Sequence, residues 1–156
     1  MNIEINRQKF ILHVKELMRD HGEMSPSDLS RAVHCELHSV TKWLNGTFYP
    51  RYETLVALSD YFQTSVDFIL GLTENDLSVR SANTIPFALR LKTILERQKK
   101  SRSSLAKELG VKTTTVSKWL EQSRMPEAVN LIKLAALFDV SVEYVTGLSN
   151  QEYISF

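Results

Sequence analysis

The chain contains little cysteine, glycine or proline: 1, 5 and 4 residues, respectively, of 156. Its single cysteine, Cys35, excludes an internal disulfide and a CxxC metal site. No stretch approaches the about 20 consecutive apolar residues that a membrane span needs. The N-terminal sequence MNIEINRQKF also lacks the apolar block of a signal peptide. We therefore expect a globular, cytoplasmic protein that makes no use of a membrane.

The sequence also lacks the residue sets that carry enzyme chemistry. It has no paired carboxylates at catalytic spacing, no glycine-rich phosphate loop and no Ser/His/Asp set. We therefore expect no catalytic residue, no metal site and no cofactor, and we predict that the chain is not an enzyme. Cys35 matches the apolar Val111 in the repeat described next, so it is predicted to be a buried small hydrophobe.

What the chain does contain is an internal repeat. Residues 25–72 align with residues 101–148 at a constant offset of 76 and without a gap. The matched positions include Val40 with Val116, Lys42 with Lys118, Trp43 with Trp119, Pro50 with Pro126, Phe62 with Phe138 and Gly71 with Gly147. The repeat predicts two domains, at residues 1–72 and 85–156, joined by a polar linker at residues 73–84.

Apolar residues at helical spacing predict an all-α fold with five helices in each domain. The predicted inward side chains of the first helices are Phe10, Val14, Leu17 and Met18, and Phe87, Leu91, Ile94 and Leu95. Those of the fourth helices are Leu55, Val56, Leu58 and Phe62, and Leu131, Ile132, Leu134 and Phe138. The third helix of the second domain is predicted from about residue 112 to 120, with Val116, Trp119 and Leu120 turned inward.

The near-neutral total charge conceals an asymmetry between the halves. Residues 1–76 carry 7 Lys and Arg against 11 Asp and Glu, a net charge of −4. Residues 77–156 carry 12 against 7, a net charge of +5. Because basic side chains supply much of the affinity for DNA phosphates, the second half is the stronger candidate to dominate DNA binding.

The segments LAKELGVKTTTVSKWLEQSRMP and LIKLAALFDVSVEYVTGLS identify a family. Together with their counterparts in the first half, they resemble the Cro and lambda-repressor-like helix-turn-helix domains, the XRE family of bacterial and phage regulators. The resemblance implies a five-helix domain whose third helix enters the major groove, while the start of the second helix and the loop after the third hold phosphates. It implies a transcriptional regulator, expected to be a repressor, whose partner is double-stranded operator DNA.

The resemblance assigns DNA-contacting positions in the second domain. Threonine can exchange hydrogen bonds with base edges or touch a thymine methyl, and lysine can reach guanine O6 and N7. The base-reading candidates are Thr113, Thr114 and Lys118, with Thr115 at the edge of the interface. Arg102, at the start of the second helix, and Arg124, after the third, match phosphate-holding positions.

The first domain departs from the family pattern. His34 replaces the turn glycine, and Glu36 puts a carboxylate near where phosphates would come. The matching DNA-contact positions are held by Leu37, His38, Ser39, Lys42 and, for the DNA backbone, Arg51. Two hypotheses follow: either this domain also reads bases, or it is an adaptor that docks a protein partner while only the second domain binds DNA.

Three further questions stay open at this stage. Lys112 and Glu36 stand where a capping Ser or Thr is expected before the third helix, so an alternative places the cap at Thr113. An extended linker of twelve residues spans about 40 Å, enough for one chain to occupy two half-sites about 34 Å apart; a homodimer is the alternative. The apolar tail, residues 152–156, is expected to cover its own domain or a second copy.

Overall fold

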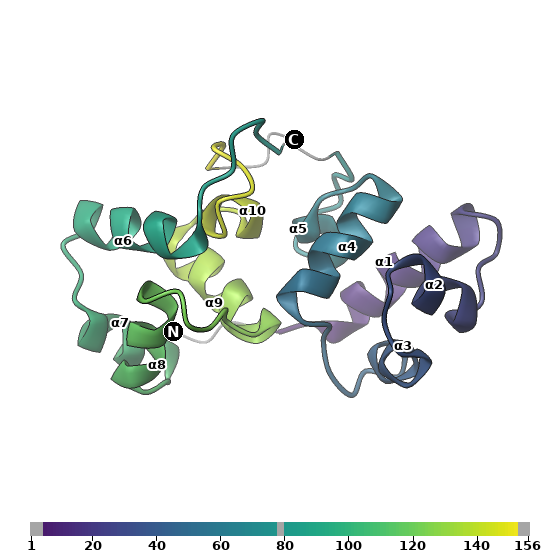
Figure 1. Cartoon of the computed structure of the whole chain (residues 1–156), viewed down its shortest axis with the longest axis horizontal. Helices are drawn as coiled ribbons and strands as arrows, with labels where there is room; N and C mark the ends of the chain where they lie inside the picture. Colours follow the sequence, from purple (N-terminus) through teal and green to yellow (C-terminus); the bar gives the residue numbers. More distant parts are fainter. Residues whose placement is uncertain (1–4, 78–79, 153–156) are drawn as a thin grey trace. The chain divides into compact units, whose positions relative to one another are not determined.

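The computed structural model describes residues 5–77 and 80–152, and in these ranges it contains ten α-helices and no strand (Figure 1). The described residues form two units, residues 5–77 and residues 80–152, with five helices each. The predicted all-α class and the count of five helices per domain are therefore confirmed for these residues. Residues 153–156 of the predicted apolar tail lie outside the described residues.

The helices follow the same order in both domains. Those of the first domain are α1 (Arg7–Asp20), α2 (Pro26–Ala32), α3 (Leu37–Leu44), α4 (Tyr52–Phe62) and α5 (Val66–Ile69). Those of the second are α6 (Phe87–Arg97), α7 (Arg102–Leu109), α8 (Thr113–Leu120), α9 (Ala128–Phe138) and α10 (Val142–Val145). Within the described ranges, none of these helices is long and apolar enough to cross a membrane.

The predicted apolar stripes lie inside each domain, with three differences of degree. The inward positions of α1, α4, α6 and α9 are buried, except that Leu17 and Val56 are half-buried. Leu120, at the end of α8, is also half-buried and packs against the edge of the core. These three side chains lie at the borders of their apolar stripes, where a helix turns from core to solvent.

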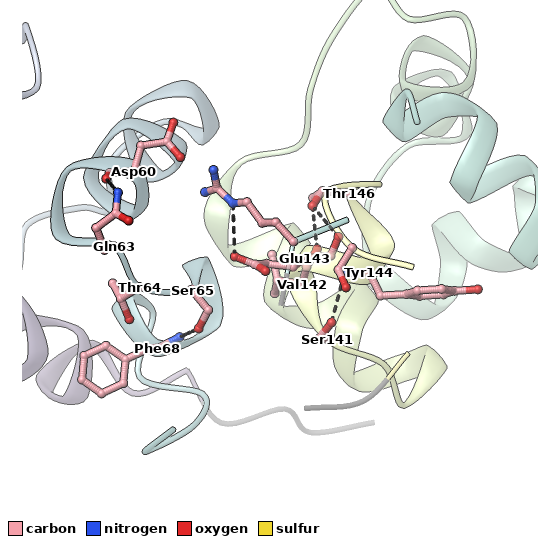
Figure 2. A network of polar contacts seen from close by, with 12 residues as sticks. Asp60, Gln63, Thr64, Ser65, Phe68, Ser141, Val142, Glu143, Tyr144 and Thr146 are labelled. Carbon is pink, nitrogen blue, oxygen red and sulfur yellow. Dashed lines mark hydrogen bonds and ion pairs between the residues drawn. The ribbon is translucent and has the colours of Figure 1, made fainter. Parts of the chain in front are cut away.

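The short helices begin at serine caps. The Ser101 hydroxyl accepts the backbone N–H of Ser104 at 3.1 Å and caps α7. Ser65 and Ser141 cap α5 and α10 in the same way, accepting N–H groups at 2.9 Å (Figure 2). A side-chain acceptor of this kind satisfies a backbone donor that a helix cannot satisfy internally, and it stabilises the helix by about 1 kcal/mol.

Each helix-turn-helix pair is held by a left-handed residue and a buried tryptophan. α7 packs against α8, and α2 packs against α3. Gly110 ends α7 at a φ of 72°, as predicted, and His34 adopts a φ of 54° at the matching turn. On the inner face of the following helix, Trp119 is 1% exposed and Trp43 is 3% exposed. The predicted core position of both tryptophans is therefore confirmed.

Cys35 is less buried than predicted. It is half-buried, as is Val111 at the matching position of the second domain. Burial raises the pKa of its thiol, because the thiolate would lose solvation there. The raised pKa keeps the group in the unreactive thiol form at neutral pH, in keeping with a packing role.

Both ends of the predicted linker are fastened to the adjacent domain. The Thr64 hydroxyl donates to the carbonyl of Asp76 at 2.7 Å, and Thr73 is buried. On the other side, the backbone N–H groups of Ser81 and Ile85 donate to the carbonyls of Leu148 and Gly147, both at 3.0 Å. The length of chain that stays clear of both domains is therefore shorter than twelve residues.

Two glycines with positive φ provide a test of this packing. At Gly147, with a φ of 85°, an added Cβ would lie 2.0 Å from the carbonyl oxygen of Ile85, whereas at Gly110 it would meet no atom within 4 Å. We expect Gly110→Ala to destabilise the protein by about 1 to 2 kcal/mol, the strain of a left-handed alanine. Gly147→Ala should cost about 2 kcal/mol more, because backbone must move.

Urea unfolding of the two full-length variants, followed by circular dichroism, measures the difference. Equal losses of unfolding free energy in the two variants would contradict the close approach of Gly147 to Ile85.

Candidate nucleic-acid interface

The outer face of α8 carries the predicted base-reading residues of the second domain. Val116 and Trp119 are buried, which turns Thr113, Thr114 and Lys118 into solvent. Thr115 is half-buried, consistent with a position at the edge of such a surface. The structure therefore brings the three exposed side chains onto one face of one short helix, where hydroxyl groups and an ammonium group are free to meet base edges.

Arg102 connects the start of α7 to this helix. Its side chain is half exposed, and its Nη1 donates to the Ser117 hydroxyl of α8 at 3.2 Å. The same nitrogen lies 3.9 Å from a carboxylate oxygen of Glu121, just after α8. The predicted phosphate-holding arginine is thus aligned by α8, a contact that sequence reasoning did not find because it joins residues fifteen positions apart.

The loop after α8 presents the second predicted phosphate contact. Arg124 is exposed. The loop reverses at Gln122, which has a φ of 61°, and the backbone N–H and the hydroxyl of Ser123 both donate to the carbonyl of Lys118, at 3.0 and 3.2 Å. These bonds fix the loop to the end of α8 and hold Arg124 on the chain directly after the reading helix.

A basic hollow of about 540 Å³ lies beside Arg102 and extends the cationic surface beyond the predicted residues. Part of its lining is apolar, and one acidic side chain, Glu96, reduces its positive charge. It is lined by Lys92, Leu95, Glu96, Lys99, Lys100, Ser101, Arg102 and Leu120. The sequence signal for it was the run Arg97-Gln98-Lys99-Lys100 before the cap of α7, but Lys92 joins the group only through the helical turns of α6.

In the first domain, α3 presents a less polar outer face. Leu37 is 45% exposed and His38 is exposed, while Ser39 is half-buried. The half-buried Lys42 places its ammonium group 5.0 Å from the centroid of the Phe48 ring, which is itself 43% exposed. The ammonium of Lys42 is therefore engaged by an aromatic face, unlike the exposed Lys118 at the matching position.

The start of α2 differs from the start of α7 in charge. Pro26 stands where the second domain has Arg102, and Asp28 stands where it has Ser104. The Asp28 carboxylate accepts the backbone N–H of Ser25 at 2.9 Å and pairs with Arg31 at 2.7 Å. The hydrogen bond from the Ser25 backbone is the main reason that the pKa of Asp28 is lowered. A carboxylate therefore lies where an incoming phosphate would need a cation.

The predicted backbone contact Arg51 is exposed and begins α4 as its N-cap residue. At the positions where the second domain has Arg102 and Glu127, the first domain has Pro26 and Arg51. The two domains thus share a framework and differ in where positive charge lies along the matching surface.

The alternative that Thr113 caps its helix is wrong. The cap residue of α8 is Lys112 and that of α3 is Glu36, and neither makes a side-chain cap hydrogen bond. The backbone N–H of Thr115 instead donates to the Lys112 carbonyl at 3.0 Å, and α8 starts at Thr113. This start sets the register in which Thr113 and Thr114 lead the helix and Lys118 follows more than one turn later.

Two protein-family models match the chain, one in each domain. A model described as Cro/C1-type HTH DNA-binding domain matches residues 13–75, and a model described as Helix-turn-helix matches residues 91–145. No curated protein and no solved structure matches the chain. Domains of these families are typically not enzymes. The chain belongs to the Cro/lambda-repressor-like, or XRE, helix-turn-helix family, carries the domain twice in tandem, and is a DNA-binding transcription regulator of this type.

Proposed function

We propose that the protein is a sequence-specific regulator that places α8 in the major groove of double-stranded DNA and draws most of its affinity from the second domain. Thr113, Thr114 and Lys118 read base edges, and Arg102 and Arg124 hold phosphates. The proposal rests mainly on one observation. Arg102, the proposed phosphate contact, donates to Ser117 of α8, the helix whose exposed face carries the proposed base-reading residues.

The charge distribution supports the leading role of the second domain. Its half of the chain carries a net charge of +5, and the basic hollow beside Arg102 adds the exposed Lys92 and Lys99, whereas Lys100 is paired with Glu108. Each phosphate neutralised by Lys or Arg releases counterions, which is the main source of DNA affinity at moderate salt. Repression, the direction of regulation that we propose, rests on the family resemblance alone.

The first domain has two candidate roles. It reads a second half-site through His38, Ser39 and Lys42, or it docks a protein partner. The second role is favoured by the exposed Leu37 and Phe48 on its outer face, because large apolar side chains exposed together are typical of protein contacts. Its net charge of −4 also disfavours a strong independent attraction to DNA.

Selection of duplexes from a random pool with the full-length protein, at near-physiological salt, tests the proposed function. Enrichment of one motif would support sequence-specific binding. An asymmetric bipartite motif would indicate that both domains read DNA, and a palindrome would indicate a homodimer presenting two second domains. If no motif is enriched, the sequence-specific function is contradicted and the adaptor hypothesis takes its place.

Thr114→Ala should relax base preference at one or two positions of the selected motif. The change removes a hydroxyl and a methyl group from the exposed face of α8, so we expect affinity for the selected duplex to fall by about 1 to 3 kcal/mol while affinity for random duplex is unchanged. Binding curves on both duplexes measure this, and equal losses on the two would contradict a base-reading role.

Arg102→Ala should weaken binding to all sequences alike. Loss of one phosphate contact is expected to reduce the slope of log affinity against log salt by about 0.9. Arg102→Lys separates charge from position, because lysine keeps the charge but cannot reproduce the planar guanidinium that donates to Ser117. A salt titration of the three proteins is the measurement, and an unchanged slope in Arg102→Ala would remove Arg102 from the interface.

The matched lysines of the two reading helices compare the domains directly. Lys118→Ala should cost about 1 to 3 kcal/mol on the selected duplex, because its ammonium is exposed on the reading face. Lys42→Ala should cost about 0.5 kcal/mol or less, in the range of surface substitutions, because its ammonium lies against Phe48. Fluorescence anisotropy on one duplex measures both variants, and a larger loss for Lys42→Ala would reverse the assigned order of the domains.

A further inference from the structure

Each domain places a cationic or titratable side chain of its first helix beneath an aromatic ring of its fifth helix. His13 on α1 is 2% exposed, and Arg90 on α6 is 6% exposed. The His13 ring stacks on Phe68 with centroids 4.2 Å apart and an interplanar angle of 14°. The central guanidinium carbon of Arg90 lies 3.9 Å from the centroid of the Tyr144 ring (both rings are drawn in Figure 2). The arrangement is thus common to the two domains.

The same two side chains reach the segment that follows the fifth helix. Arg90 Nη2 donates to Oδ1 of Asn150 at 2.7 Å. His13 Nε2 lies 3.3 Å from Oε2 of Glu74. Glu74 and Asn150 are matched positions of the repeat, at its offset of 76. We call His13, Phe68 and Glu74 the first clasp, and Arg90, Tyr144 and Asn150 the second clasp.

The two clasps differ in whether their hydrogen-bond donors depend on pH. Arg90 is permanently protonated and faces a neutral amide, so the second clasp is closed at any physiological pH. In the first clasp, His13 Nδ1 lies 2.5 Å from the carbonyl oxygen of Phe68, while Nε2 faces the Glu74 carboxylate. Both neighbours are acceptors. A neutral imidazole has one donor nitrogen, so either neutral tautomer leaves a lone pair facing an oxygen.

Other charged groups around His13 do not replace its proton. On α1 itself, Lys9 Nζ lies 3.9 Å from the second carboxylate oxygen of Glu74, but both side chains are more than half exposed, so water and salt screen this pair. On α5, the acidic residue next to Phe68 is the buried Asp67. α3, which also packs against α1, carries His38 and Lys42 on its outer face, away from its buried Val40 and Trp43.

We propose that the first clasp is a proton-dependent fastener of the chain segment Thr73–Leu77, which leads from the first domain into the second. The doubly protonated ring satisfies both Phe68 and Glu74 and closes the clasp. The closed state holds one proton more than the open state, so a falling pH favours closure and a rising pH favours release. Histidine is the side chain whose unperturbed charge change falls between about pH 5 and 8.

Release frees part of the connection between the two helix-turn-helix domains. When Glu74 leaves His13, the segment loses that contact and keeps others, such as the bond from Thr64 to the Asp76 carbonyl. A longer free connection raises the number of relative positions that the domains can take, and this lowers their effective concentration at paired half-sites. This consequence for DNA rests on the proposed function, whereas the clasp itself does not.

Nuclear magnetic resonance of the full-length protein without DNA tests the clasp between pH 5.5 and 8.5. The ¹⁵N shifts of the His13 ring should show both nitrogens protonated at low pH and loss of the Nε2 proton as pH rises. The amide signals of residues 73–77 should shift with the same midpoint. Exchange protection of the Asn75 and Leu77 amides should fall about tenfold between pH 6 and 8, within the limit for one linked proton.

The chain supplies two matched controls. The Asn150 amide, which donates to the Ser81 hydroxyl at 2.8 Å beside the second clasp, should keep its protection across the range, because Arg90 does not titrate. In Glu74→Gln, the amide can donate to a neutral His13 Nε2, so the pH dependence of residues 73–77 should disappear. His13→Arg copies the second clasp and should also remove that dependence. If the His13→Arg variant does not fold, the Glu74→Gln variant still tests whether the pH dependence comes from the clasp.

Two results would overturn the proposal. One is a His13 ring that is neutral throughout the range while residues 73–77 stay protected. The other is an unchanged pH dependence in Glu74→Gln, which would assign the effect to another group. Duplex selection distinguishes these failures from a failure of the proposed function: a protein that selects no motif yet shows the coupled titration keeps the clasp, and the reverse result keeps the function.

Discussion

Burial of one tryptophan per reading helix is the constraint on which the rest of the interface depends. An isolated helix of eight residues is not stable in water, so α8 exists because Val116 and Trp119 attach it to the core. That attachment fixes its rotation about its own axis. Since Trp119 lies inside, Thr113, Thr114 and Lys118 have to lie outside. Removing a buried tryptophan typically costs about 3 to 5 kcal/mol, which makes the orientation of the reading face hard to change.

The two domains keep this framework and differ in charge around it. Pro26 and Asp28 occupy the positions of Arg102 and Ser104, and His34 holds a left-handed turn that suits a glycine such as Gly110. A non-glycine residue at such a φ costs about 1 to 2 kcal/mol. The first domain tolerates this cost because the turn is fixed on both sides by packed helices. Much of its divergence therefore lies in surface chemistry and in local strain, although the buried His13 also differs from the buried Arg90.

The sequence predicted those features that follow from local pattern. The ten helices and their buried stripes arise from residues within a few positions of one another. What it did not predict joins residues far apart in the chain: the bond from Arg102 to Ser117, the hollow that brings Lys92 near Lys99, and the fastening of residues 73–85. The capping alternative at Thr113 was wrong because cap preference is weak where the core fixes the start of a helix.

The two clasps beneath the fifth helices share a geometry but differ in the chemistry of the side chain that the first helix supplies. In both domains, a planar nitrogen-bearing side chain of the first helix contacts an aromatic ring of the fifth helix and a polar side chain of the following segment. Arginine has donors on both of its terminal nitrogens at any pH. A neutral imidazole has one donor nitrogen for the two acceptors that face His13, so the proposed clasp depends on a second proton. The second clasp joins α6 to the segment after α10, whereas the first clasp lies at the start of the connection between the two domains. The proposed pH-dependent contact therefore stands where its release can change how the domains act together.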